Sequence, residues 1–415
     1  MNIQLKRIAL LLLACLSFLM TGCITNPTRK APPPAGSWLV LLCKASDAPD
    51  EPHPVSYYEE IFSRNNRVLL FDYFDIESNH KVDVSGTEVY GWFSMSVKTA
   101  DIAPSVRNNN TPVTRTQTAR DCKASALGAI LATGVSVDPA NYAGVITVIN
   151  VPVDVGATGE KSVVTSYHAE SEIGFFSHEM LHVLGLPDSW SASADASADH
   201  VWNHGGDAMY GDCWDAMSFR TCDSHYLVTS RGPQSPELQG AFRERLGWLP
   251  TDRIQLIPGY TSQTKTIALA PINNSSKLGI QLVDIEVPNQ GYYVVEYHQR
   301  FGFDRSMLFL DEAVVIRESR NNRTTYLVLR QDGTGAWRAG DVFTDKGNYL
   351  SIAVDNISLG NATITINTAY SPNILHVGDQ CGDRYRGEVL ACPNGTQCKS
   401  KRLGSQLETV DWYCQ

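Results

Sequence analysis

The sequence predicts an α+β protein with three folded parts: a mixed-sheet domain over residues 38–250, a β-sandwich over 251–370 and a small disulfide-rich module over 371–415. Three observations support this division. Strand and helix patterns are mixed up to about Pro250, short strands at regular spacing follow, and four cysteines crowd the end of the chain.

Composition limits the function classes. Of the 415 residues, 43% are hydrophobic and 19% are charged, which is ordinary for globular protein. The formal net charge is -10. Such an acidic chain is not expected to bind nucleic acid. The sequence has no internal repeat and leaves the oligomeric state open.

Residues 1–22 are predicted to be an export signal. A short basic region precedes an apolar run from Ile8 to Met20, which is too short to span a bilayer as a mature helix. The stretch MTGC, ending at Cys23, resembles a bacterial lipobox, although Met20 stands where such boxes usually carry leucine. We expect an exported protein, either released or attached to the membrane through a lipidated Cys23, with residues 23–37 as a Pro-rich spacer.

The elements of the first domain follow from apolar runs and helical spacing. WLVLLCKAS and RVLLFDYFDI are predicted to be strands, with the amphipathic helix PVSYYEEIFSR between them. ARDCKASALGAILATG is predicted to be a second helix, and YAGVITVINVPV a buried strand.

The character of the chain changes after Asp252. Seven short strands are predicted, in TKTIALAPI, GIQLVDIEV, GYYVVEYHQR, EAVVIRES, TTYLVLR, YLSIAVDNI and NATITINTAY. Threonine and isoleucine alternate in TITI, as expected for a strand with one buried face. Regular strand spacing without a notable helix favours a β-sandwich.

Eight cysteines remain once Cys15 and Cys23 are assigned to the leader or its lipid, and an even number in an exported chain favours disulfides. The tail has little that could form a core and needs covalent staples. The sequence does not fix the pairing, although Cys213 with Cys222 would close a short loop. The eight are Cys43, Cys122, Cys213, Cys222, Cys381, Cys392, Cys398 and Cys414.

The stretch SHEMLHVLGLPD carries the strongest chemical signal. Residues four apart lie on one face of a helix, so His178 and His182 can bind one zinc ion. Glu179 lies beside them and is predicted to act as the general base on a zinc-bound water, whose pKa the metal lowers. The alternative is a buried helix with two core histidines, which the combination with Glu179 makes a poor explanation.

The helix must end before a third ligand can return to the metal. Gly185 is predicted to end it, and Pro187 prevents it from resuming. Asp188 is then the expected third ligand, with the fourth position open for water. His200 and His204, in a downstream loop, are alternatives for the third position.

These residues resemble a known family. HEMLHVLGLPD resembles the extended zinc motif of metzincin-type peptidases, and GLPD is similar to the immune inhibitor A-like bacterial metallopeptidases. YGDCWDAMSF resembles the tight turn that places a methionine, here Met217, under the zinc. The resemblance covers about residues 38–369 and implies a zincin-like catalytic domain in which Met217 supports the ligands by packing and does not bind the metal.

Two departures limit this resemblance. Asp188 replaces the histidine that most metzincins use, and Phe219 stands where some have a tyrosine that stabilises the oxyanion. Zinc itself must then supply most of that stabilisation, unless Tyr226 or Tyr210 contributes. The acidic insert from Asp195 to Asp212 is a candidate calcium site, with solvated carboxylates as the alternative.

The sequence therefore predicts an exported zinc-dependent endopeptidase that acts on protein substrates. One alternative is a surface binding or adhesion protein with an inactive or structural zinc site. Glu179 argues against it, because a structural zinc normally has a fourth protein ligand and no use for a base. The other alternative is a zinc hydrolase that acts on cell wall or glycoproteins, which the sequence does not distinguish.

Overall fold

The computed structural model describes residues 36–65, 69–104, 112–167, 173–191, 211–218, 232–258, 261–287, 291–306, 312–319, 325–330, 334–345, 349–358 and 360–369, with the backbone of 28–29, 227–229, 398–402 and 410–414. Several residues singled out above lie outside the described part, together with the predicted export signal: Cys23, Asp195, His200, His204, Tyr210, Phe219, Cys222 and Tyr226. Among the described helices, none is long and apolar enough to span a membrane.

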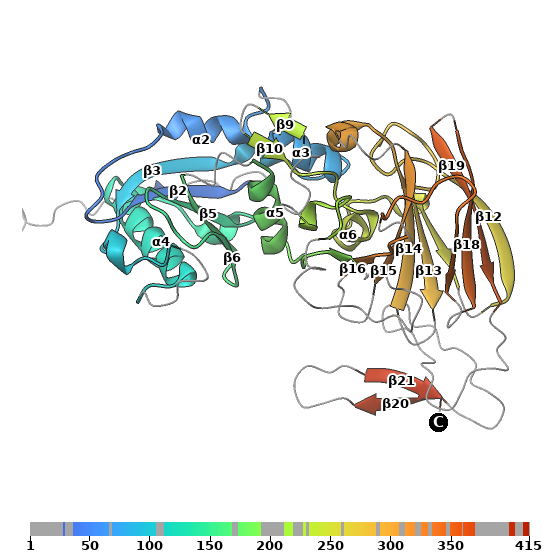
Figure 1. Cartoon of the computed structure of the whole chain (residues 1–415). Coiled ribbons are helices and arrows are strands. Elements are labelled where there is room, and N and C mark those ends of the chain that lie inside the picture. Colours follow the sequence, from blue (N-terminus) through green and yellow to red (C-terminus); the bar gives the residue numbers. More distant parts are fainter. Residues whose placement is uncertain are drawn as a thin grey trace, which may run out of the picture.

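The first unit is built on a five-stranded sheet with strand order β3-β2-β5-β7-β6, in which β6 runs antiparallel to β7 and the other neighbours are parallel (Figure 1). Its strands are β2 (Leu39–Lys44), β3 (Glu88–Ser94), β5 (Val145–Ile149), β6 (Gly156–Thr158) and β7 (Ser162–Ser166). Val40 and Leu42 of β2 face one core, and Leu39 and Leu41 face another. Both faces of the sheet are covered, which explains why WLVLLC is apolar throughout.

Helices supply those two cores. α4 packs against the face of Leu39 and Leu41, while α2, α3 and α5 pack against the opposite face. The helices are α2 (Val55–Phe62), α3 (Leu70–Glu77), α4 (Arg115–Ala132), α5 (Ile173–Val183) and α6 (Gly240–Arg245), with short 3-10 turns at Val84–Gly86, Thr99–Asp101, Pro139–Asn141, Ala216–Ser218, Thr251–Arg253 and Gly302–Ser306.

The prediction of a strand in RVLLFDYFDI is wrong, because Leu70–Glu77 forms α3. Its buried residues are Leu70, Tyr73, Phe74 and Glu77. These positions follow the spacing of a helical face, three, four and seven residues from the first. The aromatic and apolar content suggested a strand, whereas the spacing of the buried positions is that of a helix.

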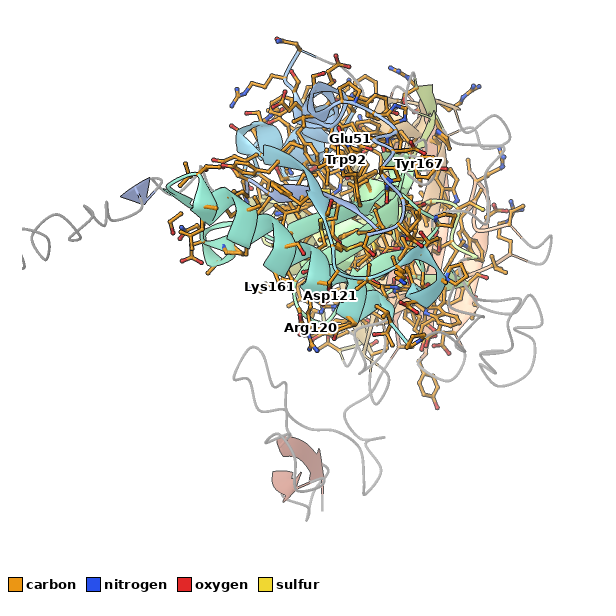
Figure 2. All side chains as sticks on the ribbon, turned by 90° about the vertical axis from the view of Figure 1, so that its left-hand side faces the viewer. Glu51, Trp92, Arg120, Asp121, Lys161 and Tyr167 are labelled. Carbon is orange, nitrogen blue, oxygen red and sulfur yellow. A yellow bond between two sulfur atoms is a disulfide. The ribbon has the colours of Figure 1, made fainter. Side chains whose placement is uncertain are left out.

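A disulfide joins the sheet to the helix behind it. Cys43 of β2 is bonded to Cys122 of α4. Cys213 is also disulfide-bonded. Two residues earlier in α4, Arg120 forms an ion pair with Glu160 in the β6–β7 turn, where Figure 2 shows Arg120 near Lys161. α4 is thus fixed to both a central strand and the edge hairpin.

The second unit consists of two sheets that share one apolar core (Figure 1). The six-stranded sheet has the order β11-β13-β14-β15-β16-β8, and the four-stranded sheet the order β12-β19-β18-β17. Strands fall in all seven segments predicted for this region. The bounds are β8 (Trp190–Ser191), β11 (Ile254–Ile257), β12 (Gln263–Leu269), β13 (Leu282–Val287), β14 (Gly291–His298), β15 (Ala313–Ser319), β16 (Thr325–Leu327), β17 (Val342–Asp345), β18 (Leu350–Ser358) and β19 (Asn361–Thr368).

The two units are not divided cleanly at Pro250. β8 precedes that position by about sixty residues, yet it forms the edge of the six-stranded sheet through parallel pairing with β16. Three further pairs complete the described strands: β1 (Thr28–Arg29) with β4 (Val135–Ser136), β9 (Leu227–Thr229) with β10 (Gly232–Gln234), and β20 (Cys398–Arg402) with β21 (Val410–Cys414).

Candidate metal centre

The centre is built on α5, which ends in a defined turn. The amide of Leu186 donates to the carbonyl of Leu181 (3.1 Å), and the amide of Gly185 donates to that of His182 (2.9 Å). This pair of hydrogen bonds is a Schellman motif, which requires a left-handed residue at its centre. Gly185 takes that role with φ +95°. The chain therefore reverses immediately after the second histidine and brings Asp188 back toward the helix.

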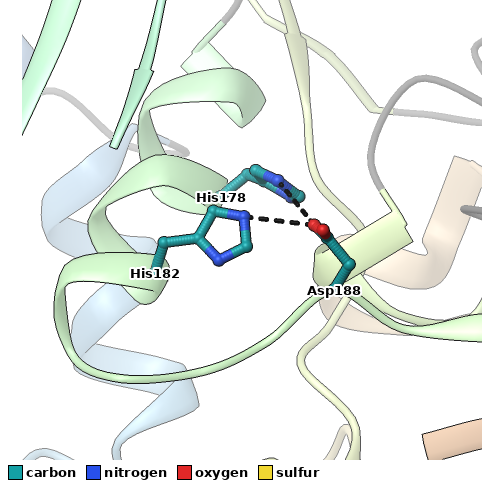
Figure 3. A group of neighbouring side chains, drawn as sticks. All are labelled: His178, His182 and Asp188. Atoms are coloured by element: carbon teal, nitrogen blue, oxygen red, sulfur yellow. Dashed lines mark ion pairs between the residues drawn. The ribbon is translucent and has the colours of Figure 1, made fainter. Parts of the chain in front are cut away.

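Three side chains converge at this turn (Figure 3). Asp188 Oδ1 lies 3.5 Å from His178 Nε2 and 3.1 Å from His182 Nε2. Among the described residues, these three are the group whose ligand atoms could bind one metal ion. Donor atoms about 2.0–2.1 Å from a tetrahedral zinc ion lie about 3.3 Å apart, so both distances fit such an ion.

Both imidazoles are oriented by backbone carbonyls. His178 Nδ1 lies 3.0 Å from the carbonyl oxygen of Ala216, and His182 Nδ1 lies 2.8 Å from that of Leu186. A carbonyl can only accept, so each Nδ1 must carry a proton and donate it. In the neutral ring the lone pair is then on Nε2, the atom that faces Asp188. Metal-binding histidines are commonly held in this way.

Asp188 is the less satisfied member of the group. Its Oδ1 is buried and accepts no hydrogen bond from the described part of the chain. A buried carboxylate oxygen without a donor is costly. A cation placed between this oxygen and the two Nε2 atoms would compensate it, so the residues present fit a zinc ion.

The balance between burial and the neighbouring carboxylates differs for the two histidines. Burial lowers the pKa of His178 and outweighs the neighbouring carboxylates. Burial also opposes the charged form of His182, but the adjacent carboxylate of Asp188 and the charge of Glu179 raise its pKa. His178 is therefore the ring more easily kept neutral, as a metal ligand must be.

Glu179 of α5 lies next to the cluster and faces β6, the edge strand of the five-stranded sheet. The side chain is 7% exposed, and its Oε2 accepts a hydrogen bond of 2.5 Å from the amide of Ala157 in β6. The carbonyl of Ala157 accepts one from Arg115 (3.2 Å), which also pairs with Asp154 (2.8 Å). The carboxylate is thus fixed against the outer edge of β6, beside the two histidines.

Met217 lies in the tight turn Ala216–Ser218 and is fully buried. It belongs to the same apolar core as Met180 and Leu181 of α5. Its carbonyl accepts a hydrogen bond from the amide of Ser189 (3.1 Å). The turn therefore touches both the segment that follows Asp188 and, through the carbonyl of Ala216, the ring of His178.

Sequence reasoning missed the groups that orient the ligands. The carbonyls of Ala216 and Leu186 and the amide of Ala157 are backbone atoms, so no residue type marks them. His298 is fully buried and lies between Glu296 and Asp304, away from the three candidate ligands.

Comparison with known proteins adds little. No protein-family model and no curated protein matches the chain. Among solved structures, the crystal structure of wild-type OgpA from Akkermansia muciniphila is similar, with 11% sequence identity, a TM-score of 0.30, and coverage of 76% of this chain and 99% of that chain. A likeness at this level carries no argument about fold or activity.

Proposed function

We propose that this chain is an exported zinc-dependent endopeptidase, with His178, His182 and Asp188 as metal ligands and Glu179 as general base. The observation that carries the proposal is the convergence of two oriented Nε2 atoms and one buried carboxylate oxygen at distances that suit zinc. Export is supported by the sequence of residues 1–22 alone.

A zinc ion at this position would act as a Lewis acid on a carbonyl and would lower the pKa of water. The protein groups supply the rest. Glu179 can receive the proton of an attacking water and return it to the leaving amine. Its hydrogen bond to Ala157 holds the carboxylate in place before substrate binds. Asp188 and the two histidines leave one tetrahedral position without a described protein ligand, as catalytic sites require.

A peptide is the substrate that the surroundings of Glu179 favour. β6 forms the edge of the five-stranded sheet and lies against α5. Extended peptides bind to such edges by adding a strand. A peptide along β6 would bring a carbonyl beside Glu179, with the Ala157 backbone exchanging its present partners for the substrate.

The test compares two variants of the full chain. Glu179→Gln removes the base, and Glu160→Gln removes an exposed carboxylate in the turn after β6. Zinc content and cleavage of a denatured general protein substrate are measured for both and for the wild type. We expect about one zinc ion per chain in all three, and cleavage lost by at least about a hundredfold in Glu179→Gln alone.

Zinc binding without cleavage of any peptide or unmodified protein by the wild type would reject the endopeptidase. Activity confined to glycoproteins or cell wall would change the proposed substrate class but leave the proposed roles of the zinc ligands and Glu179 in place. No hydrolysis of any of these would favour the binding protein.

A further inference from the structure

The segment that carries Asp188 runs directly into the second unit. β8 begins two residues after Asp188 and pairs with Tyr326 and Leu327 of β16. Consecutive Cα atoms lie 3.8 Å apart, so a residue this close to a paired strand has little freedom to move. The position of the third ligand is thus tied to the six-stranded sheet.

The same sheet holds the segment 211–218, which contains the turn around Met217. Arg317 of β15 donates to both carboxylate oxygens of Asp212 (2.6 and 3.3 Å) and to the carbonyl of Trp214 (3.4 Å). Arg317 and Asp212 are fully buried. β16 lies between β15 and β8 in the sheet, so a single strand separates this contact from β8.

A second connection starts on β16 itself. Gln239 Nε2 donates to the hydroxyl of Thr325 (2.7 Å) and to Asp215 Oδ2 (2.5 Å). Its backbone amide donates to the other oxygen of Asp215 (3.2 Å). Asp215 immediately precedes Ala216, whose carbonyl orients His178. Thr325 therefore reaches the ring of a metal ligand through two buried side chains.

The segment after Asp188 and the segment 211–218 are also hydrogen-bonded to each other. Ser189 Oγ lies 2.8 Å from Ser218 Oγ, and Ser218 Oγ donates to the carbonyl of Ser189 (3.1 Å). All these groups are buried, so water does not replace a lost contact. A shift of β15 or β16 relative to the first unit would displace Asp188 and His178 together.

We propose that the six-stranded sheet positions the metal ligands, with Arg317 and Thr325 as the positioning residues. The second unit is then part of the metal centre and not an appended targeting module. This inference rests on the proposed function, since it assumes that the three side chains bind zinc.

The experiment measures zinc affinity, by competition with a chelator, in three full-chain variants. Arg317→Lys keeps the charge and loses the two-pronged contact, and Thr325→Val removes the hydroxyl at nearly constant shape. Tyr293→Phe is the control, because it removes a buried hydrogen bond between the two sheets (to Asp345, 2.8 Å) without touching either segment. Thermal unfolding and the visible spectrum of the Co2+ form are recorded for each.

Groups that orient metal ligands change affinity by about 10–100-fold, and these act one step farther away. We therefore expect zinc affinity to fall about tenfold in Arg317→Lys and Thr325→Val, with a shifted Co2+ spectrum. Tyr293→Phe should lower the melting temperature and leave zinc affinity within about twofold.

Unchanged affinity and spectra in both positioning variants would overturn the inference, as would an equal loss in Tyr293→Phe. In either case a wild type that binds zinc and cleaves protein leaves the proposed function intact. A wild type that binds no zinc removes both.

Discussion

Two neighbouring clusters of buried charged and polar side chains differ in where the positive charge that balances their carboxylates comes from. In the buried ion network, Arg317 pairs with Asp212 and Glu296, and His298 lies between Glu296 (2.9 Å) and Asp304 (2.7 Å). Every carboxylate in this network has a cationic partner from the chain. The candidate metal centre instead gathers a carboxylate and two imidazoles.

The pKa shifts express the same contrast. Burial opposes the charged form of His298, but Asp304 and Glu296 raise its pKa to about 9. Burial raises the pKa of Glu296, but Arg317 and His298 lower it to about 2. At the metal centre the two histidines differ: burial prevails for His178 and lowers its pKa, whereas Asp188 and Glu179 raise the pKa of His182. The network holds its own cations, whereas the centre is suited to receive one.

The largest expected effect is at the metal centre. Zinc binding of about 10–16 kcal/mol shared by three protein ligands assigns about 4 kcal/mol to each. His182→Ala should therefore weaken zinc affinity by about a thousandfold. Chelator competition measures this, with His80→Ala, an exposed histidine paired with Asp75, as the control. Equal zinc affinity in both variants would remove the distinction between the clusters.

Substitutions in the buried ion network should lower the free energy of unfolding. Arg317→Met leaves buried Asp212 without its cation and Glu296 with His298 alone, which costs about 3 to 4 kcal/mol of unfolding free energy. Urea unfolding measures this change. Arg64→Met, which breaks an exposed pair with Asp83, should have no measurable effect. A small effect of Arg317→Met would show that the network is not held by its own charges.

The buried ion network should also make the free energy of unfolding depend on pH through His298. The pKa of His298 is raised from 6.5 to about 9 in the folded state, so its contribution is fully present below pH 6.5 and lost as pH rises through 9. The shift corresponds to about 3 kcal/mol. Unfolding free energy measured from pH 6 to pH 10 should fall, and His298→Gln should flatten that fall. A parallel decline in the variant would assign the dependence to other groups.

The smallest effect concerns the turn that returns Asp188 to the helix. Gly185→Ala places a Cβ at φ +95° and should cost about 1 kcal/mol. Gly128→Ala, inside α4 where an added Cβ meets nothing within 4 Å, should be neutral or slightly stabilising. Unfolding of both variants gives the comparison. Equal effects would mean that the left-handed turn is not a constraint.

The two clusters also differ in how far the sequence reveals them. His178, Glu179, His182 and Asp188 lie within one helix and its exit turn, so helical periodicity and one glycine suffice to group them. The residues of the buried ion network come from distant strands and loops, and Arg317 of β15 meets Asp212, which lies in a loop 105 residues earlier, only through the tertiary fold. No short-range pattern encodes such a contact.

Long-range pairing explains only some of the elements that were missed. Seven strands of the second unit alternate or form apolar runs, and their positions followed from the sequence, whereas β11 (Ile254–Ile257) and β17 (Val342–Asp345) were not predicted. β8 has two residues and is a strand only because β16 pairs with it. α3 was mistaken for a strand because its aromatic content outweighed its spacing.

The central claim concerns which atoms bind the metal. The most direct measurement is a crystal structure of the zinc-loaded chain with anomalous scattering recorded at the zinc edge. We expect one anomalous peak about 2.0–2.2 Å from His178 Nε2, His182 Nε2 and an Asp188 oxygen, with no fourth protein ligand. A peak bound by His200 or His204 in place of Asp188, a fourth protein ligand, or no peak at this position would contradict it.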